Sequence, residues 1–150
     1  MSLQVCEIFY SIQGESTRAG YPCVFVRLAG CNLRCTYCDT VYAQTGGTEY
    51  SVEDIIFAVS EYPCRLVELT GGEPLLQDQT PHLIQELLDR NYTVLLETNG
   101  SIALDGLDRR CIKIVDVKCP SSGERYSFNS AVLDGLSAQD ELKFVIADRG

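Results

Sequence analysis

Short, continuous apolar runs alternate along the chain with segments of helical periodicity, and this alternation restricts the folds open to it. Runs rich in branched residues and without a polar face are typical of strands buried on both faces. The predicted strands span residues 23–28, 66–70, 92–97, 112–117 and 141–146, with a further candidate at 3–9. Strands that alternate with helices pair in parallel through right-handed crossovers. We therefore predict an α/β fold with about five or six mainly parallel strands.

Two of the intervening segments carry the marks of amphipathic helices. Ser51 precedes the first of them, and Asp54 stands at the position that completes a capping box. Pro81 lies in the first turn of the second helix. Proline is tolerated there because a backbone N–H in the first turn has no hydrogen-bond partner within the helix. The apolar stripes comprise Val52, Ile55, Ile56 and Val59 in the first helix and Leu83, Ile84, Leu87 and Leu88 in the second. Such stripes pack helices against a sheet, as an α/β fold requires.

Polar or glycine-rich clusters follow four of the predicted strands. They occupy residues 31–38, 70–74, 97–100 and 116–118. A doubly wound sheet and a partial (β/α) barrel both suit this order, and both place their sites at the carboxyl ends of parallel strands. Because no repeat or linker divides the chain, we predict that residues 1–150 form one domain with a functional site at that edge of the sheet.

The composition of the chain limits which binding partners and which cellular compartment we expect. The chain has 12 Lys and Arg against 21 Asp and Glu, for a net charge of −9. Nucleic acids and anionic membranes attract clustered basic residues, so we expect no nucleic acid and no membrane as a partner. Eight cysteines raise the possibility of disulfides, but disulfide-rich domains follow a signal peptide, which residues 1–10 do not resemble. We therefore expect a cytoplasmic protein with reduced cysteines.

Three of the cysteines form a C-x3-C-x2-C pattern. Cys31, Cys35 and Cys38 can wrap one metal centre, whereas a structural zinc site needs four ligands. His82, the only histidine, falls in a predicted surface helix and makes a poor fourth ligand. A [4Fe–4S] cluster normally takes four cysteines, so three leave one iron open to a substrate or cofactor. The cluster is the favoured interpretation, and a zinc site is the alternative.

This cysteine pattern, with Tyr37 directly before the last cysteine, resembles the signature of the radical S-adenosylmethionine (SAM) superfamily. The TGGEP segment at residues 70–74 is similar to the glycine-rich stretch that binds SAM in that superfamily. The resemblance implies a partial (β/α) barrel with a [4Fe–4S] cluster and with SAM on its open iron. Glycines let the backbone approach a ligand closely, and the Glu73 carboxylate would pair with the SAM ammonium.

Further motifs resemble one family within that superfamily, the 7-carboxy-7-deazaguanine synthases. They are SIQGE at 11–15, FVRLAGC at 25–31, CDT at 38–40, ETNG at 97–100 and DVKCPSSG at 116–123. The resemblance implies a lyase that converts 6-carboxy-5,6,7,8-tetrahydropterin into 7-carboxy-7-deazaguanine with loss of ammonia, a step of queuosine and deazapurine biosynthesis. It also implies Mg²⁺, a reductant of the flavodoxin or ferredoxin type, and a homodimer.

The same resemblance assigns roles to individual residues. It implies that Cys31, Cys35 and Cys38 hold the cluster and that Thr40 binds Mg²⁺, although an ordinary loop threonine would look the same. The residues implied for SAM are Tyr37, Asp39, Gly72, Glu73, Asp116, Val117 and Lys118, and those implied for the substrate are Ile12, Gln13, Gly14, Glu15, Arg27 and Thr70. Arg27 lies in an apolar strand and needs a negative partner, which is either the substrate carboxylate or else Glu15 or Asp39.

The chain departs from the family pattern in two respects. Residues 116–118 read Asp-Val-Lys where many relatives have Ser-Pro-Lys, which weakens the assignment of the first two to SAM. Relatives are also longer, so we expect either a chain that lacks a final strand and helix or a compact variant. Two other functions fit the cysteine triplet: a small radical SAM activase of a glycyl-radical enzyme, and a non-catalytic zinc-binding module. Neither of them requires the SIQGE, CDT and KCPSSG motifs.

Overall fold

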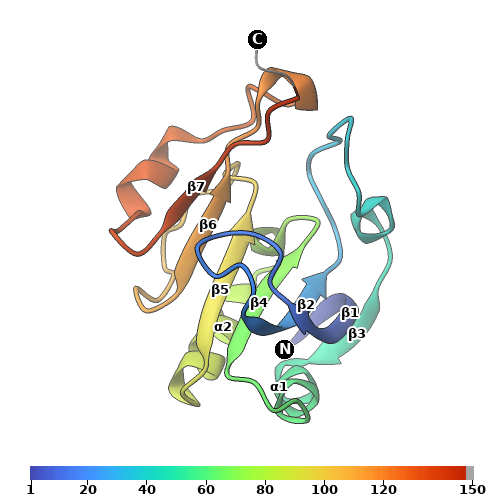
Figure 1. Ribbon diagram of the computed structural model, residues 1–150. Helices are drawn as coiled ribbons and strands as arrows, with labels where there is room; N and C mark the ends of the chain where they lie inside the picture. Colours follow the sequence, from blue (N-terminus) through green and yellow to red (C-terminus); the bar gives the residue numbers. More distant parts are fainter. Residues whose placement is uncertain (148–150) are drawn as a thin grey trace.

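A sheet of seven strands forms the centre of the computed structural model, which describes residues 1–147 (Figure 1). The strands are β1 (Ser2–Ile12), β2 (Pro22–Leu28), β3 (Thr48–Ser51), β4 (Leu66–Gly71), β5 (Thr93–Thr98), β6 (Ile112–Asp116) and β7 (Glu141–Lys143). Their order across the sheet is β3-β1-β2-β4-β5-β6-β7. Strands β2, β4, β5, β6 and β7 pair in parallel, whereas β1 pairs antiparallel with both β2 and β3. The predicted α/β fold with a mainly parallel sheet is therefore confirmed.

The sheet differs from the prediction at its two edges. The short strand β3 was not predicted, because its four residues lack a recognisable apolar pattern and gain their hydrogen bonds from β1. At the other edge, the strand predicted over residues 141–146 is shorter than expected, because β7 ends at Lys143. Its partner β6 ends at Asp116, directly opposite Lys143, so the ladder has no further partner there.

Two α-helices, α1 (Val52–Ser60) and α2 (Thr80–Asp89), follow β3 and β4. Ser51 caps α1 as predicted: its hydroxyl accepts the Asp54 N–H at 3.0 Å, and the Asp54 carboxylate accepts the Ser51 N–H at 3.3 Å. The remaining helical segments are 3-10 turns, namely η1 (Val41–Gln44), η2 (Pro74–Leu76), η3 (Pro120–Ser122) and η4 (Ser130–Gly135). The connections from β5 to β6 and from β6 to β7 contain no α-helix, which the strand–helix alternation did not predict.

Alternation along the strands separates two faces of the sheet. On β4, Val67 and Leu69 lie in the same core as the apolar stripes of α1 and α2, while Glu68 and Thr70 point to the opposite face. Both helices therefore cover one face, whereas a doubly wound sheet has helices on both. Of the two predicted architectures, this arrangement favours the partial barrel. No helix within residues 1–147 has the length and apolar character to cross a membrane.

Candidate functional site

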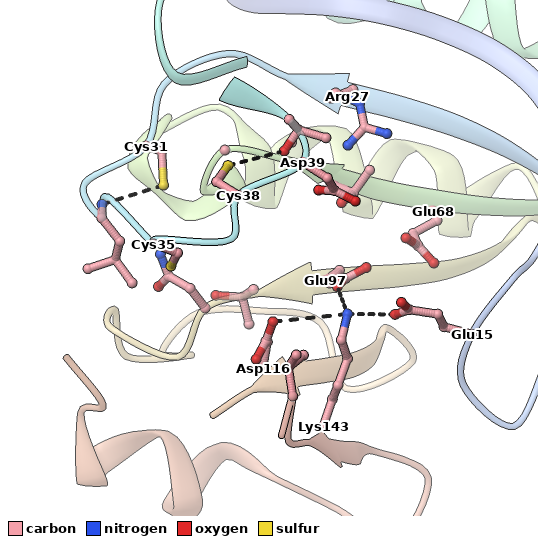
Figure 2. Close-up of a pocket in the computed structure, with 18 of the residues that line it drawn as sticks. Glu15, Arg27, Cys31, Cys35, Cys38, Asp39, Glu68, Glu97, Asp116 and Lys143 are labelled. Carbon is pink, nitrogen blue, oxygen red and sulfur yellow. Dashed lines mark hydrogen bonds and ion pairs between the residues drawn. The ribbon is translucent and has the colours of Figure 1, made fainter. Parts of the chain in front are cut away.

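A cavity of about 410 Å³ lies at the carboxyl ends of the parallel strands, on the face away from the helices. Figure 2 shows the cysteines on one side of it and several carboxyl groups with Lys143 on the other. Its wall includes these predicted site residues: Gln13, Gly14, Glu15, Arg27, Cys31, Cys35, Tyr37, Cys38, Asp39, Thr40, Thr70, Gly72, Asp116 and Lys118. All four clusters predicted at strand ends thus contribute to one cavity.

The loop that carries the three cysteines runs from the end of β2 to η1 and is held by the turn at η3. The Thr36 N–H donates to the Ser122 carbonyl at 3.0 Å, and the Thr36 hydroxyl donates to the Ser121 carbonyl at 2.7 Å. All three thiols are half-buried. Burial raises the pKa of the Cys35 thiol, and the nearby Lys118 ammonium partly opposes this effect. The loop therefore presents its thiols at the cavity wall and not to bulk solvent.

These thiols suit a metal cluster that is bound by cysteines alone. None of the eight cysteines within residues 1–147 forms a disulfide. In the same range no three His, Cys, Asp or Glu side chains stand close enough together to hold a single metal ion unaided. The donor set is three thiols on one short loop, facing one cavity. Thiolates are the ligands of iron–sulfur clusters, which span a larger volume than one ion, so the residues fit the group that the motif implies.

Glycine is required where this loop meets the end of β4. Gly71 has a φ of +148°, and a Cβ added there would lie 2.1 Å from the Leu28 carbonyl oxygen. A Cβ on Gly72 would lie 2.1 Å from the Gly30 carbonyl oxygen and 2.8 Å from the Cys31 Cβ. Any larger residue would displace backbone, so the two glycines bring Cys31 directly against the strand end.

Glu73 lies beneath the cavity wall and not on it. Its fully buried carboxylate accepts hydrogen bonds from the Thr98 hydroxyl at 2.8 Å, the Asn99 N–H at 2.7 Å and the Leu75 N–H at 3.0 Å. Burial raises the pKa of this carboxyl, although the three donors stabilise its charge. Glu73 thus ties the end of β4 to the end of β5, and its pairing with the SAM ammonium stays a prediction.

Arg27 reaches the cavity from β2, and its charge is paired with Glu7 on β1, with Nε donating to Oε1 at 2.7 Å. Neither Glu15 nor Asp39 pairs with it, which corrects the predicted protein partners. The Tyr42 hydroxyl donates to the same Glu7 oxygen, and these two hydrogen bonds lower the pKa of Glu7. The two Nη atoms of Arg27 make no hydrogen bond within residues 1–147, so they are available to an anionic ligand.

Asp116 and Lys118 form an ion pair on the cavity wall, with Nζ 2.8 Å from Oδ2. Lys118 Nζ also lies 5.7 Å from the centroid of the Tyr37 ring. The second carboxylate oxygen of Asp116, Oδ1, is buried and has no hydrogen-bond partner among the described residues. A buried acceptor without a donor is unfavourable, and a donor on a bound ligand would satisfy it.

Besides Glu73, the structure leaves two of the predicted residues outside the cavity wall. Ile12, at the end of β1, is 65% exposed and lies outside the wall. The Val117 side chain packs against the apolar cluster of Leu104, Val115 and Val132. Its backbone N–H donates to the Lys143 carbonyl at 2.8 Å. In both cases the neighbouring residue in the chain faces the cavity instead, because side chains alternate along an extended backbone.

The wall also holds three charged residues to which sequence analysis assigned no role: Glu68 on β4, Glu97 on β5 and Lys143 on β7. Lys143 Nζ lies 2.7 Å from Glu97 Oε1 and 2.5 Å from Glu15 Oε2 (Figure 2). Burial disfavours the charge of Lys143, but the two carboxylates outweigh burial and raise its pKa. A charged residue inside a largely apolar strand is the signal that could have identified Glu68 and Glu97. Lys143 lies in a strand of three residues, two of them charged, which gives no such signal.

Comparison with known proteins adds to this geometry. Residues 25–119 match the family model of the radical SAM superfamily. A protein from Koribacter versatilis named 7-carboxy-7-deazaguanine synthase is 48% identical over 149 residues, which cover 98% of this chain and 66% of that protein. Proteins of the same name from Chlorobaculum tepidum and Thermoplasma acidophilum are 53% and 42% identical, over 81% and 96% of this chain. The chain spans 55% and 70% of their lengths.

The similarity extends to a solved structure. The crystal structure of QueE from Escherichia coli superposes with a TM-score of 0.83 at 25% sequence identity. The match covers 95% of this chain and 70% of that chain. The fold of this chain therefore has a counterpart among solved structures, although most sequence positions differ.

Proposed function

Because the chain belongs to the radical SAM superfamily and, within it, to the 7-carboxy-7-deazaguanine synthase family, we propose that it catalyses the reaction for which its relatives are named. The lyase reaction converts 6-carboxy-5,6,7,8-tetrahydropterin into 7-carboxy-7-deazaguanine and ammonia, within queuosine and deazapurine biosynthesis. One observation carries the proposal: the three cysteines and Arg27 line the same cavity, and the Nη atoms of Arg27 are free to bind a ligand there.

The cofactors in this proposal are a [4Fe–4S] cluster held by Cys31, Cys35 and Cys38, and SAM on its open iron. When bound, the two supply hydrogen abstraction by a 5′-deoxyadenosyl radical. The chain's own residues shape the space beside them. Gly72 leaves room against Cys31, and the unpaired Oδ1 of Asp116 can accept a hydrogen bond from SAM.

The substrate side of the cavity is suited to a carboxylated pterin. A guanidinium presents parallel N–H groups that match a carboxylate, and Arg27 has its Nη atoms free for this role. Gln13 and Thr70 lie on the same wall and offer an amide and a hydroxyl to the polar ring edges. Gly14, next to Gln13, has nothing within 4 Å of where a Cβ would stand and so leaves open space for the ring.

The partners in this proposal are a flavodoxin- or ferredoxin-type reductant and a second copy of the chain. Both are expected from the family resemblance. Eight free thiols suit a reducing compartment such as the cytoplasm, because disulfides form in oxidising ones.

Replacing Cys35 with serine tests the cluster assignment. We expect Cys35→Ser to lose most of its iron and the brown colour after anaerobic reconstitution, and to lose SAM cleavage, because a serine hydroxyl is a poor iron ligand beside thiolates. Cys64→Ser is the matched control: Cys64 lies outside the cavity, and its Sγ donates to the Pro22 carbonyl, as a hydroxyl also can. Iron analysis and absorbance spectra measure the outcome.

Product analysis of the unmodified protein separates the proposed function from its alternatives. Formation of the ultraviolet-absorbing deazaguanine with SAM, Mg²⁺ and a reductant supports the proposal. Zinc in place of iron would instead identify a metal-binding module. SAM cleavage without turnover of the pterin would identify an activase.

Thr40 is proposed as the Mg²⁺ ligand, because its hydroxyl is a hard oxygen donor on the cavity wall, 3.8 Å from Cys38 Sγ. We expect Thr40→Val to need about ten-fold more Mg²⁺ for half-maximal activity while keeping its iron content, since the loss of one ligand of several weakens the site. The Mg²⁺ dependence of turnover measures this shift. Thr45→Val, an exposed position outside the cavity, is the control. An unchanged Mg²⁺ response would remove Thr40 from the site.

A further inference from the structure

The cavity wall farthest from the cysteines holds acidic groups that the proposed roles do not use. Glu68 projects from β4 and Glu97 from β5 (Figure 2). Both line the cavity together with Thr70. Lys143 binds Glu97 and Glu15 and lies 4.0 Å from Asp116. No side-chain nitrogen of Lys or Arg within residues 1–147 lies within 4.0 Å of the Glu68 carboxylate.

Glu68 is the most enclosed of these carboxyl groups, with 3% of the residue exposed. The Gln13 side-chain amide donates to its Oε2, and Glu97, on the adjacent strand β5, lines the same cavity wall. A buried carboxyl group beside a second carboxylate is disfavoured in its charged form, both by the loss of water and by the repulsion between like charges. Burial and the facing Glu97 charge raise the pKa of Glu68 to about 8.

The charges around the pair decide where its proton resides. Lys143 from β7 binds Glu97 directly, so the negative charge lies on Glu97 and the shared proton on Glu68. Arg27 from β2 is engaged by Glu7, and Asp116 from β6 is paired with Lys118. Cys23 on β2 is buried next to Glu68, and burial raises the pKa of its thiol to about 12, so it contributes no charge.

We propose that Glu68 and Glu97 share one proton and act as the acid–base pair of the ring contraction, an assignment that rests on the proposed function. Loss of ammonia breaks a C–N bond whose electron pair leaves on nitrogen, and the nitrogen takes the proton held by Glu68. Formation of the aromatic ring releases one proton from carbon, which the ionised pair accepts. The pair ends in its starting state, and these two transfers consume no oxidant or reductant.

The surroundings of Glu68 and Glu97 support a catalytic role over a purely structural one. A carboxyl group that served only to anchor Gln13 would gain from the charge of an ion pair, whereas Glu68 forms no salt bridge within residues 1–147 and lies on the strand next to that of another acid, Glu97. Both carboxyl groups also border the space that Arg27 and Thr70 line. A pair with its charge on one member and its proton on the other can both give and take a proton near neutral pH.

Glu68→Gln is the decisive variant, because it keeps the size and the acceptor for Gln13 but removes the proton. In the reconstituted holoenzyme we expect kcat to fall at least about 100-fold, with KM changed by less than about three-fold. Deuterium placed on the substrate carbon that donates hydrogen should still reach SAM, because hydrogen abstraction precedes both proton transfers. The basic limb of the wild-type pH profile of kcat, expected near pH 8, should be absent.

Further variants and a spectroscopic measurement distinguish the loss of a catalytic group from a folding defect in Glu68→Gln. Glu97→Gln should show the same loss of kcat, and Glu53→Gln, exposed on α1, should show none. Infrared spectroscopy of the protein without substrate should show a protonated carboxyl band at neutral pH that Glu68→Gln lacks.

The outcomes distinguish a failure of the acid–base assignment from a failure of the proposed function. A wild-type enzyme that forms no deazaguanine contradicts the function, whereas the infrared band reports the shared proton in either case. If the wild type is active and Glu68→Gln keeps its kcat and basic limb, or changes KM alone, the acid–base assignment is wrong. Absence of the carboxyl band would also overturn it.

Discussion

Arg27 combines a fixed position with a free binding edge. Its guanidinium carbon lies 6.0 Å from the ring centroids of both Phe9 and Tyr42, and Glu7 holds its Nε. Aromatic faces and one carboxylate therefore restrain the side chain while leaving its Nη atoms free. A carboxylate ligand meets a guanidinium that is already oriented, which reduces the entropy lost on binding.

Arg27→Lys tests this arrangement, because lysine keeps the charge but lacks the planar pair of donors. We expect the KM for the carboxypterin to rise about 10- to 100-fold, equivalent to about 1.5–3 kcal/mol for charge-assisted hydrogen bonds. Steady-state kinetics measure the change. Arg65→Lys, whose guanidinium lies 4.8 Å from the Tyr92 ring outside the cavity, should leave KM unaltered. A normal KM in Arg27→Lys would place the substrate carboxylate elsewhere.

The junction between β4 and η2 is the element on which the cysteine loop rests. The Gly72 N–H donates to the Leu28 carbonyl at 3.2 Å, and the Glu73 N–H donates to the Gly30 carbonyl at 2.7 Å. Glu73 then holds the start of η2 and the end of β5 through its buried carboxylate. The loop and the two strand ends therefore form one hydrogen-bonded unit, and the position of Cys31 depends on the backbone of β4.

Gly72→Ala would force this unit apart. We expect the free energy of unfolding to fall by about 1–3 kcal/mol, as in overpacked sites, and the iron content after reconstitution to fall with it. Urea denaturation and iron analysis provide the two measurements. Gly14→Ala is the control for stability, since nothing lies within 4 Å of its added Cβ. Equal stability of the two variants would show that the loop accommodates a side chain at Gly72.

One buried ion pair connects β7 to the rest of the molecule. Lys113 Nζ on β6 lies 3.1 Å from Asp140 Oδ2, directly before β7, and both side chains are almost fully enclosed. The Asp140 carboxylate also accepts the Lys113 and Ser137 N–H groups, at 2.8 and 2.7 Å. Burial alone would raise the pKa of Asp140, but these partners outweigh burial and lower it. The pair thereby holds the strand that places Lys143 beside Glu97.

Asp140→Asn leaves Lys113 buried without a counter-charge, which typically costs about 3–5 kcal/mol of unfolding free energy. Because the folded-state pKa is lowered, the contribution of the pair is complete above the unfolded pKa of about 4 and is lost as pH falls through the folded value. Urea denaturation across pH should show the largest difference from wild type near neutrality and none in strong acid. Asp134→Asn, exposed on η4, is the control. Wild-type stability of Asp140→Asn at neutral pH would contradict this role.

Features that depend on near neighbours in the chain were predictable. The capping box joins Ser51 to Asp54, and the cysteine triplet and the TGGEP turn each lie within one short segment. Apolar periodicity identified both helices and the parallel strands, because burial on one face or two leaves a repeat in the sequence. The clusters at the strand ends predicted a site at the edge of the sheet where the cavity lies.

The partners of the charged residues required the folded sheet. A bulge between Val5 and Glu7 sets Glu7 opposite Arg27, 20 positions away. Gln13 meets Glu68 across 55 positions, and Lys143 meets Glu15 across 128. A shift of one residue in strand register turns every side chain to the other face. Composition and motifs therefore identify the groups that could serve a radical SAM enzyme, whereas strand order and register select which acid faces which base.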